Sequence, residues 1–129
     1  MKFLYNFTCS YVIMSLLKLK GTSFMDRKTS IKYLQEYIKE KDYNPELKKD
    51  YFLKLSEEVG ELAKAMRKGV LYKDNDNIKG TIDEELWDVM YYILALANCY
   101  DIDLESTINV KEDINNRKYN TGIVFETNR

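Results

Sequence analysis

Two acidic segments of this chain share one helical pattern. Residues 54–68 and 81–97 repeat apolar residues at intervals of three or four, and each segment carries two carboxylates three positions apart. Since an α-helix turns by about 100° per residue, each segment is expected to form an amphipathic helix with its carboxylates along the edge of the apolar stripe. The carboxylate pairs are Glu58 with Glu61 and Glu85 with Asp88.

The two helices are expected to pack antiparallel through their apolar stripes. The stripes are Leu55, Val59, Leu62 and Met66 in the first helix and Leu86, Val89, Ile93 and Ala97 in the second. This packing would gather all four carboxylates, and two charges about 4 Å apart repel by about 4 kcal/mol at an effective dielectric near 20. A compensating cation is therefore the central prediction. The alternative is a solvated acidic face, in which Asp83, Glu84 and Glu85 stabilise the helix N-terminus.

The composition favours an all-α fold in one domain. The 129 residues include one proline and five glycines, and 32% of them are charged. So few turn-forming residues argue against an all-β protein. The chain is also long enough to bury a core without disulfides or structural metal. We expect an antiparallel bundle of about four main helices joined by short connections.

Caps and apolar periodicity predict where the helices lie. The expected ranges are 30–41, 45–68, 81–100 and 103–119. The predicted N-caps are Ser30, Asn44, Thr81 and Asp103. Glu84 follows Thr81 by three residues, which is the capping-box pattern, and Gly69 is expected to end the second helix. The expected buried row of that helix is Leu47, Tyr51, Leu55, Val59, Leu62 and Met66.

The third predicted helix is apolar on most of its sides between residues 86 and 97. It is therefore expected to be the central helix of the bundle. Its apolar surface exceeds what one neighbouring helix can cover, so we expect a homo-oligomer, either a homodimer or a homotetramer.

The chain ends differ from the middle in composition. Residues 1–24 are expected to be a flexible N-terminal extension, residues 25–119 the helical domain and residues 120–129 a C-terminal tail. The apolar run at 11–17 is too short to span a bilayer, and no small-residue cleavage site follows it. We therefore expect neither a signal peptide nor a membrane anchor.

The residue types present narrow the possible chemistry. The chain has no histidine, which excludes Ser-His and Cys-His nucleophilic sites and the usual histidine-containing zinc sites. Its two cysteines cannot form a disulfide framework, and Cys99 is expected to be a buried thiol in a reducing cytoplasm. The net charge of -1 provides no general basic field for nucleic acid or an anionic membrane. Carboxylate oxygens suit hard cations such as magnesium or manganese, often bound with substrate phosphates.

The two motifs together resemble a known family, the MazG-like all-α nucleotide pyrophosphohydrolases. The resemblance rests on the sequence EEVGEL at 57–62, followed by EELWDV at 84–89, in that family's ExxE and ExxD arrangement. It continues through ALAN at 95–98 and IDLE at 102–105 to Lys111 and Asn115. In all it covers about residues 30–119.

This resemblance implies a reaction and a set of site residues. Glu58, Glu61, Glu85 and Asp88 would bind Mg²⁺, with Mn²⁺ as the alternative, and the reaction would split a nucleoside triphosphate into a monophosphate and pyrophosphate. The proton of the attacking water would go to Glu57 or to a ligand such as Glu58 or Glu61. Lys111 and Asn115 would contact phosphate or sugar. Lys54 is a further candidate to reach the phosphates, with a solvated surface position as the alternative.

Other functions remain open at this point. One alternative is an enzyme of the same fold dedicated to dUTP, dCTP or phosphoribosyl-ATP. Another is a non-catalytic helical module whose acidic edge binds a basic partner. A di-iron carboxylate bundle is disfavoured because the chain lacks Glu-x-x-His pairs. Base preference cannot be derived from the spacing; the candidate pocket walls are Tyr33, Gln35, Tyr37 and Tyr43.

Overall fold

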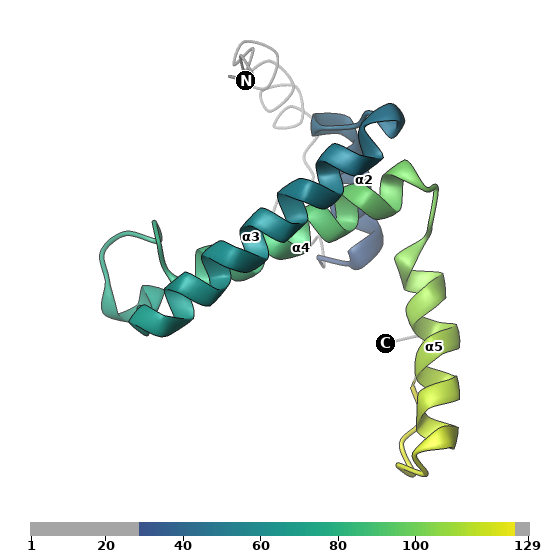
Figure 1. Cartoon of the computed structure of the whole chain (residues 1–129). Coiled ribbons are helices and arrows are strands. Elements are labelled where there is room, and N and C mark those ends of the chain that lie inside the picture. Colours follow the sequence, from purple (N-terminus) through teal and green to yellow (C-terminus); the bar gives the residue numbers. More distant parts are fainter. Residues whose placement is uncertain (1–28, 126–129) are drawn as a thin grey trace, which may run out of the picture.

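The computed structural model describes residues 29–125, and its regular elements are helices (Figure 1). The α-helices are α2 (Ile31–Lys41), α3 (Lys48–Lys68), α4 (Ile82–Cys99) and α5 (Leu104–Lys118). Two short 3-10 helices are η1 (Pro45–Leu47) and η2 (Tyr72–Asp74). The predicted all-α class with four main helices is confirmed. The predicted extension at 1–24 lies outside the described residues.

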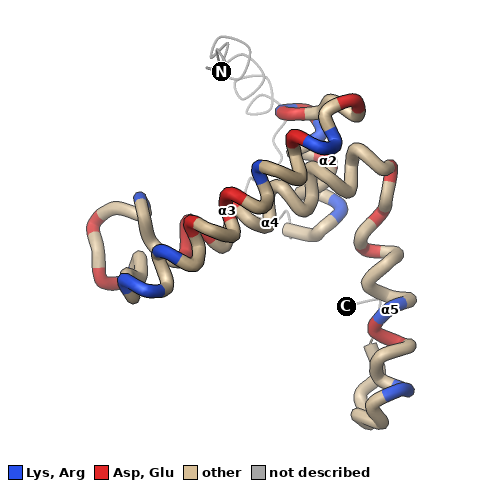
Figure 2. Tube along the Cα trace, viewed as in Figure 1, with Lys and Arg blue, Asp and Glu red and all other residues tan. Residues whose placement is uncertain are grey.

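Helices α3 and α4 form a long antiparallel pair, which we call the arm (Figure 1). Helix α2 packs across the end of the arm where α3 begins and α4 ends, and it is the main contact of α5. Helix α5 extends away from the arm after the turn that follows α4. Acidic and basic positions are interspersed along α3 (Figure 2). Among the described residues, no helix is both long and apolar enough to cross a membrane.

Side-chain caps begin the helices where the sequence predicts them. The Ser30 hydroxyl accepts a hydrogen bond from the Tyr33 amide at 3.1 Å, and the Asp103 carboxylate accepts one from the Ser106 amide at 3.3 Å. These caps satisfy amides that have no partner inside the helix. Gly69 ends α3 in the left-handed conformation, with φ at 67°, which a residue without Cβ adopts readily.

Two predicted helix starts differ in detail. The segment Pro45–Leu47 forms a 3-10 turn after the Asn44 cap, so the α-helix begins at Lys48 rather than at Pro45. Thr81 caps α4, but the Glu84 carboxylate does not accept a hydrogen bond from the Thr81 amide. That amide donates instead to the Ile78 carbonyl at 3.1 Å. The Glu84 carboxylate accepts from the Gly80 amide at 2.6 Å. The reciprocal capping box is therefore replaced by a contact with the preceding loop.

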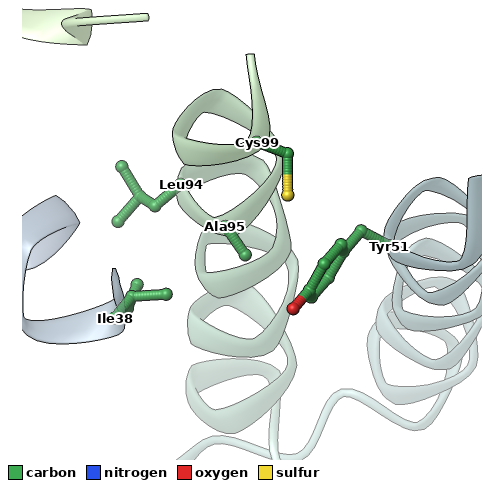
Figure 3. Packing of buried hydrophobic residues seen from close by; sticks show 5 residues of the cluster. All are labelled: Ile38, Tyr51, Leu94, Ala95 and Cys99. Atoms are coloured by element: carbon green, nitrogen blue, oxygen red, sulfur yellow. The ribbon is translucent and has the colours of Figure 1, made fainter. Parts of the chain in front are cut away.

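The core lies at the end of the arm that α2 covers. Ile38 of α2, Tyr51 of α3 and Leu94, Ala95 and Cys99 of α4 form its buried cluster (Figure 3). Helix α4 packs against both α2 and α3, which confirms its predicted central position. Cys99 is a free, buried thiol, as predicted.

The predicted apolar stripes of the arm are only partly buried. Leu55, Leu62 and Val89 are half-buried and Ala97 is buried. The prediction is wrong for the remaining members and for Leu47 of the expected buried row, which are exposed by the following fractions: Leu47 37%, Val59 49%, Met66 62%, Leu86 54% and Ile93 44%. The reason is geometric. Each helix of a two-helix arm has one neighbour, and that neighbour covers a narrower strip than a bundle would cover.

A buried amide pair sets where α5 begins. The Gln35 side-chain amide donates to the Asn98 side-chain oxygen at 3.2 Å and to the Ile102 carbonyl at 2.8 Å. Its oxygen accepts from the Leu104 amide at 3.0 Å, at the first residue of α5. The Asn98 amide donates back to the Gln35 carbonyl at 2.8 Å. Both side chains are buried, so this network joins α2, α4 and the start of α5.

Replacing Gln35 should test this network. In Gln35→Leu, three hydrogen bonds are lost and buried polar groups lose their partner, so we expect a loss of at least about 2 kcal/mol of unfolding free energy. Urea unfolding followed by circular dichroism at one fixed protein concentration measures it. The control is Glu36→Gln, an exposed neighbour on α2. Equal midpoints for the two variants would contradict the proposed role of the network.

Candidate metal and active site

Three carboxylates meet between α3 and α4. Because the helices run antiparallel, Glu58 of α3 comes opposite Glu85 and Asp88 of α4. One oxygen from each of these side chains lies within 4.8 Å of the other two. Three of the four predicted metal ligands are therefore together in the folded chain.

Partial burial makes this cluster electrostatically unfavourable by itself. Glu85 is buried, whereas Glu58 and Asp88 are half-buried. Burial raises the pKa of each of the three carboxyls, because it penalises the charged form. Acidic neighbours raise the pKa values further: Asp88 acts on Glu58, and Glu84 acts on both Glu85 and Asp88. A cation at the cluster would reverse this penalty.

The donor atoms fit a hard divalent cation. All three ligating groups are carboxylates, and no nitrogen or sulfur ligand belongs to the cluster. Oxygen donors of this kind are the ligands that Mg²⁺ and Mn²⁺ take in proteins, whereas zinc sites generally include histidine or cysteine. The chemistry of the cluster therefore agrees with the cation expected from the sequence.

Glu61 and Glu57 lie beside the cluster rather than in it. Glu61 is exposed and its carboxylate accepts from the Lys64 ammonium at 3.1 Å. Its charge nevertheless contributes to the raised pKa of Glu85. Glu57 is also exposed and pairs with the Lys54 ammonium at 2.8 Å. Exposed ion pairs of this kind are weak, so either carboxylate can turn towards a ligand at little cost.

The loop between the arm helices is tied to the first turn of α4, next to the cluster. The Glu84 carboxylate accepts from the Gly80 amide at 2.6 Å and from the Lys79 ammonium at 3.2 Å. The Gly80 hydrogen bond lowers the pKa of Glu84. Asp83 accepts from the Tyr72 amide at 2.8 Å. The sequence predicted a helix-dipole role for both acids and a capping box for Glu84; the glycine and lysine just before the cap were the signal for the loop contact.

The structure does not bring the predicted phosphate ligands of α5 to the carboxylates. Lys111 is exposed on a helix that points away from the arm (Figure 1). The Asn115 side chain donates to the Glu112 carboxylate at 3.0 Å, within α5 itself. Lys54 is the predicted phosphate contact that lies near the cluster, since its charge lowers the pKa of Glu58.

The chain is similar to known proteins in sequence and in fold. The model of the MazG nucleotide pyrophosphohydrolase domain matches residues 47–121, which include both carboxylate motifs. A crystal structure of Ctag-iMazG from Vibrio DAT 722 is 46% identical with a TM-score of 0.62, and covers 67% of this chain and 98% of its own. The Ntag-iMazG structure is 46% identical with a TM-score of 0.63, and covers 71% and 99%. No curated protein matches the chain.

The raised pKa of Asp88 leads to a prediction for the metal-free protein. A carboxyl whose pKa is raised on folding binds its proton more tightly in the folded state, so the stability of that state falls as pH rises above the ordinary value near 4. With chelator present, Asp88→Asn should therefore be more stable than the parent protein at neutral pH, and the difference should shrink towards acid pH.

Thermal unfolding across a pH series at constant protein concentration measures this difference. Asp76→Asn, in the exposed loop away from the cluster, is the matched control and should show no such trend. An Asp88→Asn variant that is less stable than the parent protein at neutral pH without metal would contradict the electrostatic account.

Proposed function

Because this chain belongs to the MazG family and is a nucleotide pyrophosphohydrolase, we propose that it hydrolyses nucleoside triphosphates to monophosphates and pyrophosphate with magnesium. The observation that carries the proposal is the meeting of Glu58, Glu85 and Asp88 within 4.8 Å. These oxygens would hold the cation, and Mn²⁺ is the alternative ion. Family membership favours catalysis over the non-catalytic module considered from the sequence.

The proposed reaction is a displacement at the α-phosphorus. A water oxygen forms the new bond to phosphorus, the bond to the α,β-bridging oxygen breaks, and pyrophosphate leaves. Bound magnesium supplies neutralisation of the phosphate oxygens and activation of water. The water proton passes to a carboxylate of this chain, for which Glu57, Glu58 and Glu61 are the candidates. Glu57 and Glu61 have the advantage that their exposed side chains are free to turn.

The substrate range is part of the proposal. We infer a role in removing non-standard or surplus nucleotides, with an enzyme dedicated to dUTP, dCTP or phosphoribosyl-ATP as the alternative. A panel of substrates separates the two, because one strongly preferred nucleotide would indicate a dedicated enzyme. We place the reaction in the cytoplasm, which is supported by the free thiol of Cys99.

We further propose that the chain acts as a homodimer or homotetramer. One exposed stripe of α3 consists of Phe52, Val59 and Met66, and one of α4 consists of Leu86, Met90 and Ile93. Each stripe lies about a quarter-turn from the contact between the helices. Viewed from one end of the arm, increasing residue numbers run clockwise around one helix and anticlockwise around the other, because the two helices are antiparallel. Both stripes therefore face the same side of the arm. A continuous apolar face of this kind favours packing against a second copy.

Lys111 would then act from another copy of the chain. The hydrogen bonds of Gln35 hold the start of α5 against α2, and from there α5 extends away from its own arm (Figure 1). No residue of α5 is buried, although Val110 and Ile114 are apolar and more than half exposed. We assign the phosphate contacts of Lys111 and Asn115 to α5 of a second copy.

Pyrophosphate release tests the reaction. We expect release from a nucleotide panel with magnesium and none with excess chelator, and we expect Asp88→Asn and Glu61→Gln to abolish turnover while leaving helix content unchanged. Both changes remove a charge and keep the side-chain shape. Glu36→Gln, exposed on α2, is the matched control and should retain full activity. Substantial magnesium-dependent turnover by Asp88→Asn would disprove its role as a ligand.

Mixed oligomers test where Lys111 acts. Alone, Lys111→Ala should raise KM by about tenfold with little change in kcat, because it removes a charged phosphate contact. Lys118→Ala, on the same helix, is the control. Chains carrying Asp88→Asn and Lys111→Ala are then co-expressed with different tags, and the mixed species is assayed at substrate concentrations below KM.

If Lys111 acts in the site of a second copy, each mixed dimer keeps one intact site, so about half of the parent activity should return. If Lys111 acts in the site of its own chain, every site carries one of the two substitutions, and activity should stay as low as that of the single variants. Light scattering on the parent protein gives its mass in solution, and a monomer would refute the proposed assembly.

A further inference from the structure

The single tryptophan of the chain stands beside the carboxylate cluster. Trp87 directly precedes Asp88 on α4 and is 39% exposed, although it is the largest apolar side chain present. Resting on the function proposed above, we propose that Trp87 stacks against the nucleobase of the bound nucleotide. Sequence reasoning placed the base among residues of α2 and the segment after it, and did not consider Trp87.

Trp87 lies at one end of a row of aromatic rings on α4. Its ring meets that of Tyr91 edge to face, with centroids 6.3 Å apart and planes at 76°. Tyr91 meets Tyr92 in the same way at 5.3 Å and 77°. The Tyr91 hydroxyl lies 3.5 Å from the Asp42 carboxylate, at the end of α2. The tryptophan is thus the exposed end of a braced aromatic row, and a braced ring loses little conformational entropy on binding a ligand.

The aromatic row runs parallel to the cluster along α4. Tyr91 follows Trp87 by four residues, and Tyr92 follows Asp88 by four, so two adjacent strips of the helix carry aromatic and acidic groups side by side. A nucleotide whose phosphates lie at the carboxylates extends its ribose and base well beyond them. Trp87 is the exposed side chain of the aromatic strip, and it directly precedes the cluster residue Asp88.

The end of α2 lies next to the aromatic row of α4. The Lys41 ammonium lies 5.4 Å from the centre of the Tyr91 ring and 5.8 Å from that of Tyr37. Gln35, a candidate for base recognition from the sequence, is occupied instead by Asn98 and the start of α5. Stacking therefore accounts for base affinity here without a hydrogen-bonding side chain that selects one base. Stacking of this kind tolerates different bases, since each has a flat ring face.

Fluorescence gives a direct reading, because Trp87 is the only tryptophan. The probes are the α,β-methylene analogue of ATP, which resists cleavage at the reacting bond, and inorganic tripolyphosphate, which has no base; both are titrated with magnesium. We expect the nucleotide analogue to change the Trp87 emission in a saturable way and tripolyphosphate to leave it nearly unchanged. Equal responses to both probes would overturn the proposal.

Kinetics of matched variants provide the second measurement. Trp87→Leu should raise KM by about tenfold with kcat within about twofold, and Trp87→Phe should restore most of the affinity, because a phenyl ring still stacks. Tyr100→Leu, an exposed aromatic residue directly after α4, is the control and should leave KM unchanged.

The rival role for Trp87 is packing between copies of the chain. An unchanged KM in Trp87→Leu, or a changed oligomer mass together with a lowered kcat, would support that role and overturn base stacking. Failure of base stacking can also be told apart from failure of the proposed reaction. If the parent protein releases no pyrophosphate from any nucleotide, the proposed reaction fails, while the titration with the two probes still decides whether Trp87 contacts a base.

Discussion

The packing of α3 against α4 is the contact on which this structure depends, and it brings like charges together. The antiparallel pairing that gives the arm its only internal contact also places Glu58 opposite Glu85 and Asp88. Burial and mutual repulsion raise the pKa values of all three carboxyls, so the arm carries an unfavourable interaction in its metal-free form. A divalent cation bound at the cluster, as proposed, would convert the same arrangement into a stabilising one. Ligand binding and stability are thus coupled through one contact.

The two ends of the arm are held by different devices. At one end, the Gln35 and Asn98 side chains join α2 to α4 and to the beginning of α5. At the other, Glu84 ties the loop to the first turn of α4 beside the cluster. The cluster lies between these ends, in the part of the arm with few buried apolar side chains. Its position follows from the antiparallel packing of α3 against α4.

The isolated chain leaves much of its apolar surface uncovered. Met66 and Leu86 are more than half exposed on the arm, and α5 has no buried residue. The proposed second copy would account for both features and would give Lys111 a route to the phosphates. Trp87 belongs to the same chain as the carboxylates it borders, so base and phosphate recognition are assigned to different elements of the assembly.

The helices, their caps and the two acidic motifs could be predicted from local sequence, because capping and amphipathic periodicity depend on residues within a few positions of each other. Val59 and Met66 were misplaced, because burial depends on how many neighbours a helix has. The pairing of Gln35 with Asn98, 63 residues apart, has no local signal. The direction of α5 follows from that pairing. The sequence alone determined the acidic motifs and the all-α class; only the tertiary structure decided which carboxylates meet, since distance between helices is not a local property.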